Sequence, residues 1–169
     1  MPEKHVLDSL DRQILALLME DAKRPYTDLA NQLYVSGGTI HVRMNKLREA
    51  GIVKGESLVI DYGKIGYDIT SFLGVYLQKS SMYDDVSEQF ARIPEIVSAH
   101  YTTGVYSVFI KVVCRDTDHL REALAAIQAI DGIQRTETFI SLEAAIERPL
   151  QLMSKTEMAE LNSRKTTKS

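Results

Sequence analysis

The spacing of apolar residues changes near residue 67, and this change is the strongest constraint on the fold. Over residues 10–47 apolar residues recur every three or four positions, which is typical of amphipathic helices. Over residues 69–78 they alternate along the chain, which is typical of a strand. We therefore expect two domains of different architecture, joined by a glycine-containing linker at residues 62–68.

The N-terminal part contains the start and stop signals of consecutive helices. Asp8, Thr27 and Ser36 each stand where a helix cap is favoured, because their short polar side chains accept hydrogen bonds from free backbone N–H groups. Pro25 separates the first helix from the second, and Gly51 follows the third as a C-terminal glycine. Three helices with a tight turn between the second and third are predicted.

Two short strand-like runs follow, at residues 52–54 and 57–60, and they predict a hairpin. Helix, helix, tight turn, helix and hairpin is the order of a winged helix-turn-helix. We expect this DNA-binding domain over residues 1–61.

The second part, residues 69–148, reads as β-α-β-β-α-β. The expected strands are 69–78, 96–103, 106–114 and 133–142. The expected helices run from Asp84 to Ile93 and from a cap at Thr117 to a break at Asp131. This order predicts a ferredoxin-like domain, in which an antiparallel four-stranded sheet carries both helices on one face. Apolar residues occur on both sides of the strands, so we expect the other face to pack against another subunit. The fold class is therefore α+β. Residues 149–169 are polar, and residues 154–169 are rich in Lys, Thr and Ser with few apolar residues, which predicts a flexible tail.

The charge of the chain is unevenly distributed. The formal net charge is −3, which taken alone argues against a nucleic-acid binder. Residues 1–66 are neutral, residues 67–148 carry −5 and residues 149–169 carry +2. Within residues 36–54, Arg43, Lys46, Arg48 and Lys54 stand against Glu49, a local charge of +3. The positive charge thus gathers on the third predicted helix and the wing, where phosphates would lie.

The outward face of the third helix supplies the candidate DNA contacts. Its first residues are those that a helix-turn-helix protein presents to base edges, and Thr39, His41 and Val42 suit such contacts. Gly38 permits close approach to a phosphate, and Lys46 and Lys54 suit phosphate binding. The full candidate set is Ser36, Gly38, Thr39, His41, Val42, Arg43, Asn45, Lys46 and Lys54. Two alternatives stay open: Arg43 contacts a phosphate or pairs with a carboxylate of the first helix, and His41 reads a base or is a plain surface residue.

Other function classes have little support in the sequence. The single cysteine, Cys114, and four scattered histidines provide no metal-binding set, and no nucleophile stands with an obvious base. We expect no enzyme activity, no cofactor and no metal. The longest apolar runs are far shorter than the ~20 residues of a membrane span, and residues 1–11 resemble no secretory signal, so a cytoplasmic protein is expected.

Three segments resemble the Lrp/AsnC (feast/famine) family of transcription regulators. They are VSGGTIHVRMNKLREAGIVKG, AHYTTGVYSVFIKV and IQRTETFISLE, and the resemblance covers about residues 6–148. The motifs GTIHVR, YTTG and TETFI are nearer to the AsnC branch. The resemblance implies binding to double-stranded DNA, a free amino acid as effector, and homodimers that pack through the sheet and assemble to octamers.

The resemblance also implies the position of the effector site. The ligand loop of the family falls on Thr102, Thr103, Gly104, Val105 and Tyr106, and its facing strand falls on Gln134, Thr136 and Thr138. Loop N–H groups can hold a carboxylate, and threonine hydroxyls can accept from an ammonium group. Many leucine-responsive members carry acidic residues where this chain has Val105 and Ser107, so no side-chain counter-ion for the ammonium group is indicated.

These expectations together describe a sequence-specific transcriptional regulator whose assembly or DNA affinity responds to an amino acid. The alternative is an amino-acid-binding regulatory or assembly subunit whose winged helix contacts protein rather than DNA. The charge on the third helix favours the first.

Overall fold

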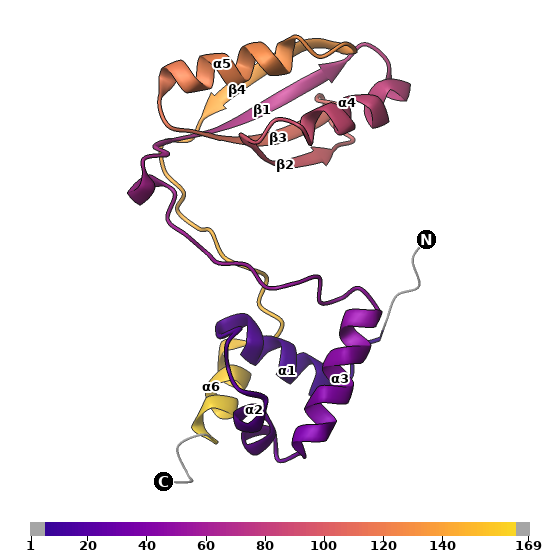
Figure 1. Ribbon diagram of the computed structural model, residues 1–169, viewed down its shortest axis with the longest axis vertical. Helices are drawn as coiled ribbons and strands as arrows, with labels where there is room; N and C mark the ends of the chain where they lie inside the picture. Colours follow the sequence, from indigo (N-terminus) through magenta and orange to yellow (C-terminus); the bar gives the residue numbers. More distant parts are fainter. Residues whose placement is uncertain (1–5, 165–169) are drawn as a thin grey trace. The chain divides into compact units, whose positions relative to one another are not determined.

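The computed structural model describes residues 6–164, and its backbone divides into two compact units (Figure 1). One unit lies within Met1–Leu58 and Glu147–Ser169, and the other is Val59–Ile146. The chain therefore leaves the first unit, builds the second, and returns to the first. None of the helices in residues 6–164 is long and apolar enough to cross a membrane.

The first unit begins with the three predicted helices, α1 (Ser9–Glu20), α2 (Tyr26–Leu33) and α3 (Gly37–Glu49). Asp8 caps α1 and Ser36 caps α3, as expected. Helix α2 begins one residue before the predicted cap Thr27, after Pro25, whose side chain makes no capping hydrogen bond. The helices enclose an apolar core in which Ile14, Leu29 and Ile40 are fully buried.

The predicted hairpin of the wing is not formed, and residues 52–60 contain no strand. The reason lies at the end of α3, where Ile52 N–H and Val53 N–H both donate to the Leu47 carbonyl, at 2.9 and 3.2 Å. These two amides complete the C-terminus of the helix and are not free for a strand ladder. Leu58 and Val59, predicted in the second strand, are 82% and 98% exposed.

The predicted flexible tail is also wrong where the structure describes it, because residues Lys155–Ser163 form helix α6. Ser154 and Glu157 form a reciprocal capping box at its start. Leu161 is only 2% exposed and lies in the core of the first unit. Buried Gln32 of α2 donates its side-chain N–H to the Leu161 carbonyl at 2.8 Å, so α6 satisfies a polar group that would otherwise be orphaned. Residues 165–169 of the predicted tail lie outside the described residues.

The second unit has the predicted ferredoxin-like topology. Its elements are β1 (Ile69–Leu77), α4 (Tyr83–Phe90), β2 (Ile96–Tyr101), β3 (Val108–Cys114), α5 (Thr117–Gln128) and β4 (Ile133–Ile140), with short 3-10 helices at Gly63–Ile65 and Ser80–Met82. The antiparallel strands follow the order β2-β3-β1-β4. Asp116, one residue before the predicted cap Thr117, caps α5. The first 3-10 helix falls within the predicted linker.

The two faces of this sheet differ in what covers them. Residues paired directly across antiparallel strands share a face, so Leu73, Ile110 and Thr138 lie on one side. Helices α4 and α5 pack there and form one core with β1 and β3. The opposite side, called here the open face, carries Phe72, Tyr76, Phe109, Lys111, Arg135, Glu137 and Phe139. Apolar residues on both faces are thus confirmed, while the covering subunit stays a prediction.

Candidate nucleic-acid interface and effector site

Helix α3 is anchored by one face and exposed on the other. Ile40, Met44 and Leu47 are buried against α1 and α2, as their spacing predicts. Val42 is 56% exposed, although it is apolar. Gly38, His41, Asn45 and Lys46 are exposed beside it, and Thr39 is half-buried. The structure therefore brings these predicted DNA contacts together on one helix surface.

The hydroxyl groups of Ser36 and Thr39 form hydrogen bonds at the N-terminus of α3. The Thr39 amide donates to Ser36 Oγ at 3.1 Å, and the two hydroxyl oxygens lie 2.9 Å apart. Ser36 thus has a structural role as the cap, which orients the first turn of the helix.

Tyr26, a residue that sequence reasoning missed, supports the exposed face of α3. Its ring meets the His41 ring edge-on with centroids 4.8 Å apart. Its hydroxyl accepts a hydrogen bond from Arg48 at 3.0 Å. Tyr26 is the first residue of α2, and no periodicity in the sequence reveals its placement beside the third helix.

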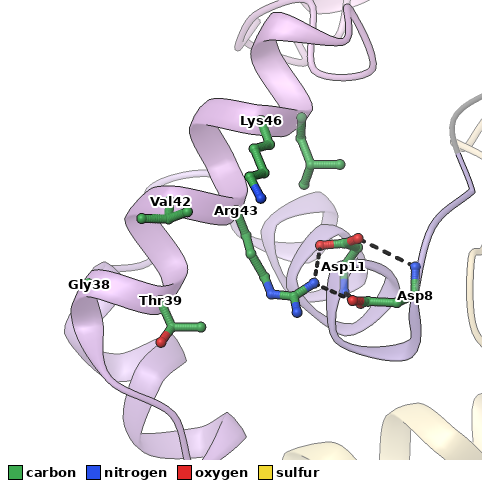
Figure 2. Close-up of a pocket in the computed structure, with 8 residues that line it drawn as sticks. Asp8, Asp11, Gly38, Thr39, Val42, Arg43 and Lys46 are labelled. Carbon is green, nitrogen blue, oxygen red and sulfur yellow. Dashed lines mark hydrogen bonds and ion pairs between the residues drawn. The ribbon is translucent and has the colours of Figure 1, made fainter.

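Arg43 takes the second of its two alternatives and pairs with carboxylates of the first helix. A hollow between α1 and α3 is lined by Asp8, Asp11, Gly38, Thr39, Val42, Arg43, Lys46 and Leu47. Figure 2 shows the Arg43 side chain extending from α3 to both carboxyl groups. Its terminal nitrogen donates to Asp11 Oδ1 at 2.8 Å and also to Asp8 Oδ2. Hydrogen bonds to Asp11 and then Asp8 raise the pKa of Arg43.

Lys54, the last candidate, follows α3 in the extended segment that replaces the predicted hairpin. It is exposed and remains in the same unit as the helix. Its position relative to α3 is set by Ile52 and Val53, whose side chains pack on the core of the unit.

The predicted effector loop connects β2 and β3, and part of it is closed by internal hydrogen bonds. The Thr102 amide donates to the Ser107 carbonyl at 3.0 Å, and its hydroxyl donates to the Tyr106 carbonyl. The Ser107 amide donates to the carbonyl of Val75 in β1 at 2.9 Å, which fixes the loop against the sheet. Thr103, Gly104 and Val105 remain exposed at its tip.

Tyr106 leaves this loop and lies across the open face of the sheet. A Cβ placed on Gly74 of β1 would come within 2.3 Å of its ring, so glycine is required beneath it. Its hydroxyl donates to Glu137 Oε2 at 2.8 Å, and the Tyr76 hydroxyl donates to Oε1 at 3.1 Å. Arg135 pairs with the same carboxylate at 2.9 Å and stacks 3.8 Å above the Tyr76 ring. The hydrogen bond from Tyr106, aided by the one from Tyr76, lowers the pKa of Glu137.

The facing residues of β4 do not share the side of Tyr106. Thr136 pairs with Val75 and Thr138 with Leu73, so both belong to the helix-covered side of the sheet. The Thr136 hydroxyl accepts from Gln128 of α5 at 3.0 Å, and Gln134 and Thr138 are exposed. The structure thus brings Tyr106 to Glu137, which sequence reasoning missed, and leaves Thr136 and Thr138 on the other face, while Gln134 lies at a break in the register of β4. The sequence signal is the alternation of side chains along a strand, because in TETFI it puts Thr136 and Thr138 on one face and Glu137 on the other.

Within residues 6–164 the structure contains no group of three or more His, Cys, Asp and Glu side chains that could hold a metal ion. A helix-turn-helix unit with an exposed third helix, joined to a ferredoxin-like unit, defines a class of two-domain DNA-binding transcriptional regulators.

Comparison with known proteins identifies the family within that class. Residues 7–48 match the AsnC-type helix-turn-helix domain, and residues 70–151 match the Lrp/AsnC ligand binding domain. Regulatory protein AsnC of Haemophilus influenzae is 45% identical over 148 residues, which cover 87% of this chain and 99% of that protein. Regulatory protein AsnC of Escherichia coli K12 is 43% identical over 150 residues, covering 88% and 99%. The chain belongs to the Lrp/AsnC family of transcriptional regulators.

Solved structures agree with this assignment. The structure of E. coli AsnC matches with a TM-score of 0.82 and 42% identity, over 87% of this chain and 99% of that one. A transcriptional regulator from Neisseria meningitidis, solved as an L-Met complex, matches with a TM-score of 0.78 and 19% identity, over 85% and 94%, and supports the fold. Helix α6 begins at Lys155, beyond both family ranges.

Proposed function

We propose that this regulator contacts double-stranded DNA through the exposed face of α3 and through Lys54. The observation that carries the proposal is the anchoring of α3 by one buried face, which leaves Gly38, His41, Val42 and Asn45 exposed next to Lys46. Side chains on the first half of such a helix reach base edges, and nearby lysines neutralise phosphates. Sequence preference and salt dependence of binding would then come from different residues.

The test measures DNA binding of single variants by fluorescence anisotropy over a range of salt. The probes are a duplex selected by the wild-type protein from a random pool and a shuffled duplex. Lys46→Gln and Lys54→Gln should each flatten the plot of log affinity against log salt by about 0.9 per lost phosphate contact. Arg121→Gln, a change at a 78% exposed side chain of the second unit, is the matched control. Wild-type binding that shows no dependence on salt or sequence would refute the proposal.

We also propose that a free amino acid is the effector and that the loop at residues 102–106 holds it. Support comes from the exposed tip of the loop and from the L-Met complex of the Neisseria relative. The amides near Gly104 suit a carboxylate, and the Thr103 hydroxyl and loop carbonyls can accept from an ammonium group. The proposal leaves out Gln134, Thr136 and Thr138, because β1 separates β4 from the loop and because Thr136 and Thr138 lie on the face opposite Tyr106.

A thermal shift screen of all twenty amino acids would identify the effector. A ligand at 100 times its dissociation constant stabilises a protein by about 2.7 kcal/mol, so a few amino acids should stand out. Tyr106→Phe removes the hydroxyl that reaches Glu137 and should weaken the response. Tyr101→Phe, at a 54% exposed tyrosine outside the loop, is the matched control. A blank screen would contradict the proposed effector class.

We further propose that a second copy of the chain covers the open face, and that such dimers assemble to octamers. The apolar surface of Phe72, Phe109 and Phe139 supports this, since Phe139 is 48% exposed in the single chain. Light scattering should show an assembly that Phe139→Glu dissociates. The proposal includes no catalytic step and no cofactor.

A further inference from the structure

Arg43 lies in the middle of the proposed DNA-binding face of α3, yet its guanidinium group already pairs with the carboxylates of Asp8 and Asp11. Its side chain is 29% exposed, against 52% for Asp8 and 11% for Asp11. The same terminal nitrogen donates to both carboxylates, which come from the first turn of another helix. Together these three side chains carry a formal charge of −1, so they offer no surplus positive charge to a phosphate.

The two carboxylates are themselves fixed by the backbone of α1. Asp8 accepts from the Asp11 amide at 2.8 Å, and Asp11 Oδ2 accepts from the Asp8 amide at 3.3 Å. This capping box holds both carboxyl groups through α1's own backbone, in positions where they also contact Arg43 (Figure 2). The hydrogen bond from the Asp11 amide, followed by the one from Arg43, lowers the pKa of Asp8, which favours the charged carboxylate beside Arg43.

We propose that Arg43 is a positioning residue of the DNA-binding unit: it fixes the recognition helix on the N-terminus of α1 and supplies no phosphate contact. Thr39 and Lys46 stand on the same hollow, four residues before and three residues after Arg43. Arg43, which lies between Thr39 and Lys46, therefore sets the angle at which the first turn of α3 meets DNA. Sequence discrimination depends on that angle, because base contacts tolerate little displacement, whereas the phosphate contribution to affinity does not.

The inference rests on the proposed DNA interface, and the same anisotropy assay separates the two. Arg43→Gln in the full chain should leave the salt slope of the wild type unchanged, while the preference for the selected duplex over the shuffled one falls. Lys46→Gln should do the reverse, with a slope flatter by about 0.9 and the preference retained. Arg121→Gln of the second unit should change neither quantity.

The carboxylates provide the complementary test. Asp8→Asn with Asp11→Asn keeps capping groups at both positions but releases Arg43. Affinity for the shuffled duplex should then rise, and the slope should steepen by about 0.9 because the freed guanidinium reaches a phosphate.

The triple variant, with both asparagines and Arg43→Gln, contains no unpaired buried acid and serves if Arg43→Gln alone does not fold. It should retain the wild-type slope. A slope as flat as that of Lys46→Gln, with sequence preference intact, in either Arg43 variant would overturn the inference and leave the DNA-binding proposal standing. Salt-independent binding by the wild type itself would refute both.

Discussion

Docking of α6 on the helix-turn-helix unit can be tested through one leucine. Leu161 is 2% exposed and packs in the core of the first unit, so Leu161→Ala removes buried methyl groups and leaves a cavity. Truncating a buried leucine to alanine costs about 2–5 kcal/mol. Because α6 is a peripheral helix that can undock and limit the loss, we expect the lower end, about 2–3 kcal/mol.

Differential scanning calorimetry of the full chain measures this loss. One kcal/mol shifts the melting temperature of a 60–100-residue domain by about 4–8 °C, so the transition of the first unit should fall by roughly 10–20 °C. The transition of the second unit should not move. Leu142→Ala, at a leucine that is 98% exposed, is the matched control and should change stability by no more than about 0.5 kcal/mol. If the Leu161 variant melts as the Leu142 variant does, the reasoning about α6 fails.

Other predictions concern the second unit. Gly74→Ala places a Cβ within 2.3 Å of the Tyr106 ring and should displace it, seen as a changed near-ultraviolet spectrum and a loss of about 1–3 kcal/mol in urea unfolding. The pKa of Glu137 is lowered from its ordinary 4.5 by hydrogen bonds from Tyr106 and Tyr76. A lowered carboxyl pKa stabilises the fold above that ordinary value, and this stability is lost as the pH falls through the folded pKa. Glu137→Gln should therefore flatten the acid side of the stability profile, and an unchanged profile would contradict the assignment. Cys114 is fully buried and burial raises its thiol pKa, so iodoacetamide should label it only after unfolding, and rapid labelling of the native chain would count against this placement.

The elements with a strong period could be predicted from the sequence alone. Ile40, Met44 and Leu47 of α3 recur at helical spacing, and the structure buries all of them. The strands of the second unit follow from their alternation, although β2 and β4 end two residues earlier than predicted. Local spacing predicts such elements because the alternation of buried and exposed side chains is set within each helix or strand, even though β1 pairs with the distant strands β3 and β4.

Features that depend on distant partners were missed. The capping box of Ser154 and Glu157 is visible as S-x-x-E, but polar composition suggested a tail, since nothing local shows that Leu161 meets α2. Counting charge over residues 36–54 gave +3 because Asp8 and Asp11, which neutralise Arg43, lie on another helix.

The chain leaves its first unit at Leu58 and returns to it at Glu147. The ferredoxin-like unit is an insertion within the helix-turn-helix unit, with the first unit's sequence on both sides of it. A chain cut after Leu58 therefore yields an incomplete first unit that lacks α6. A single protease cut between residues 59 and 68 would leave two fragments still held together by α6 on α1 and α2. Two covalent connections, and not one, therefore join the two units.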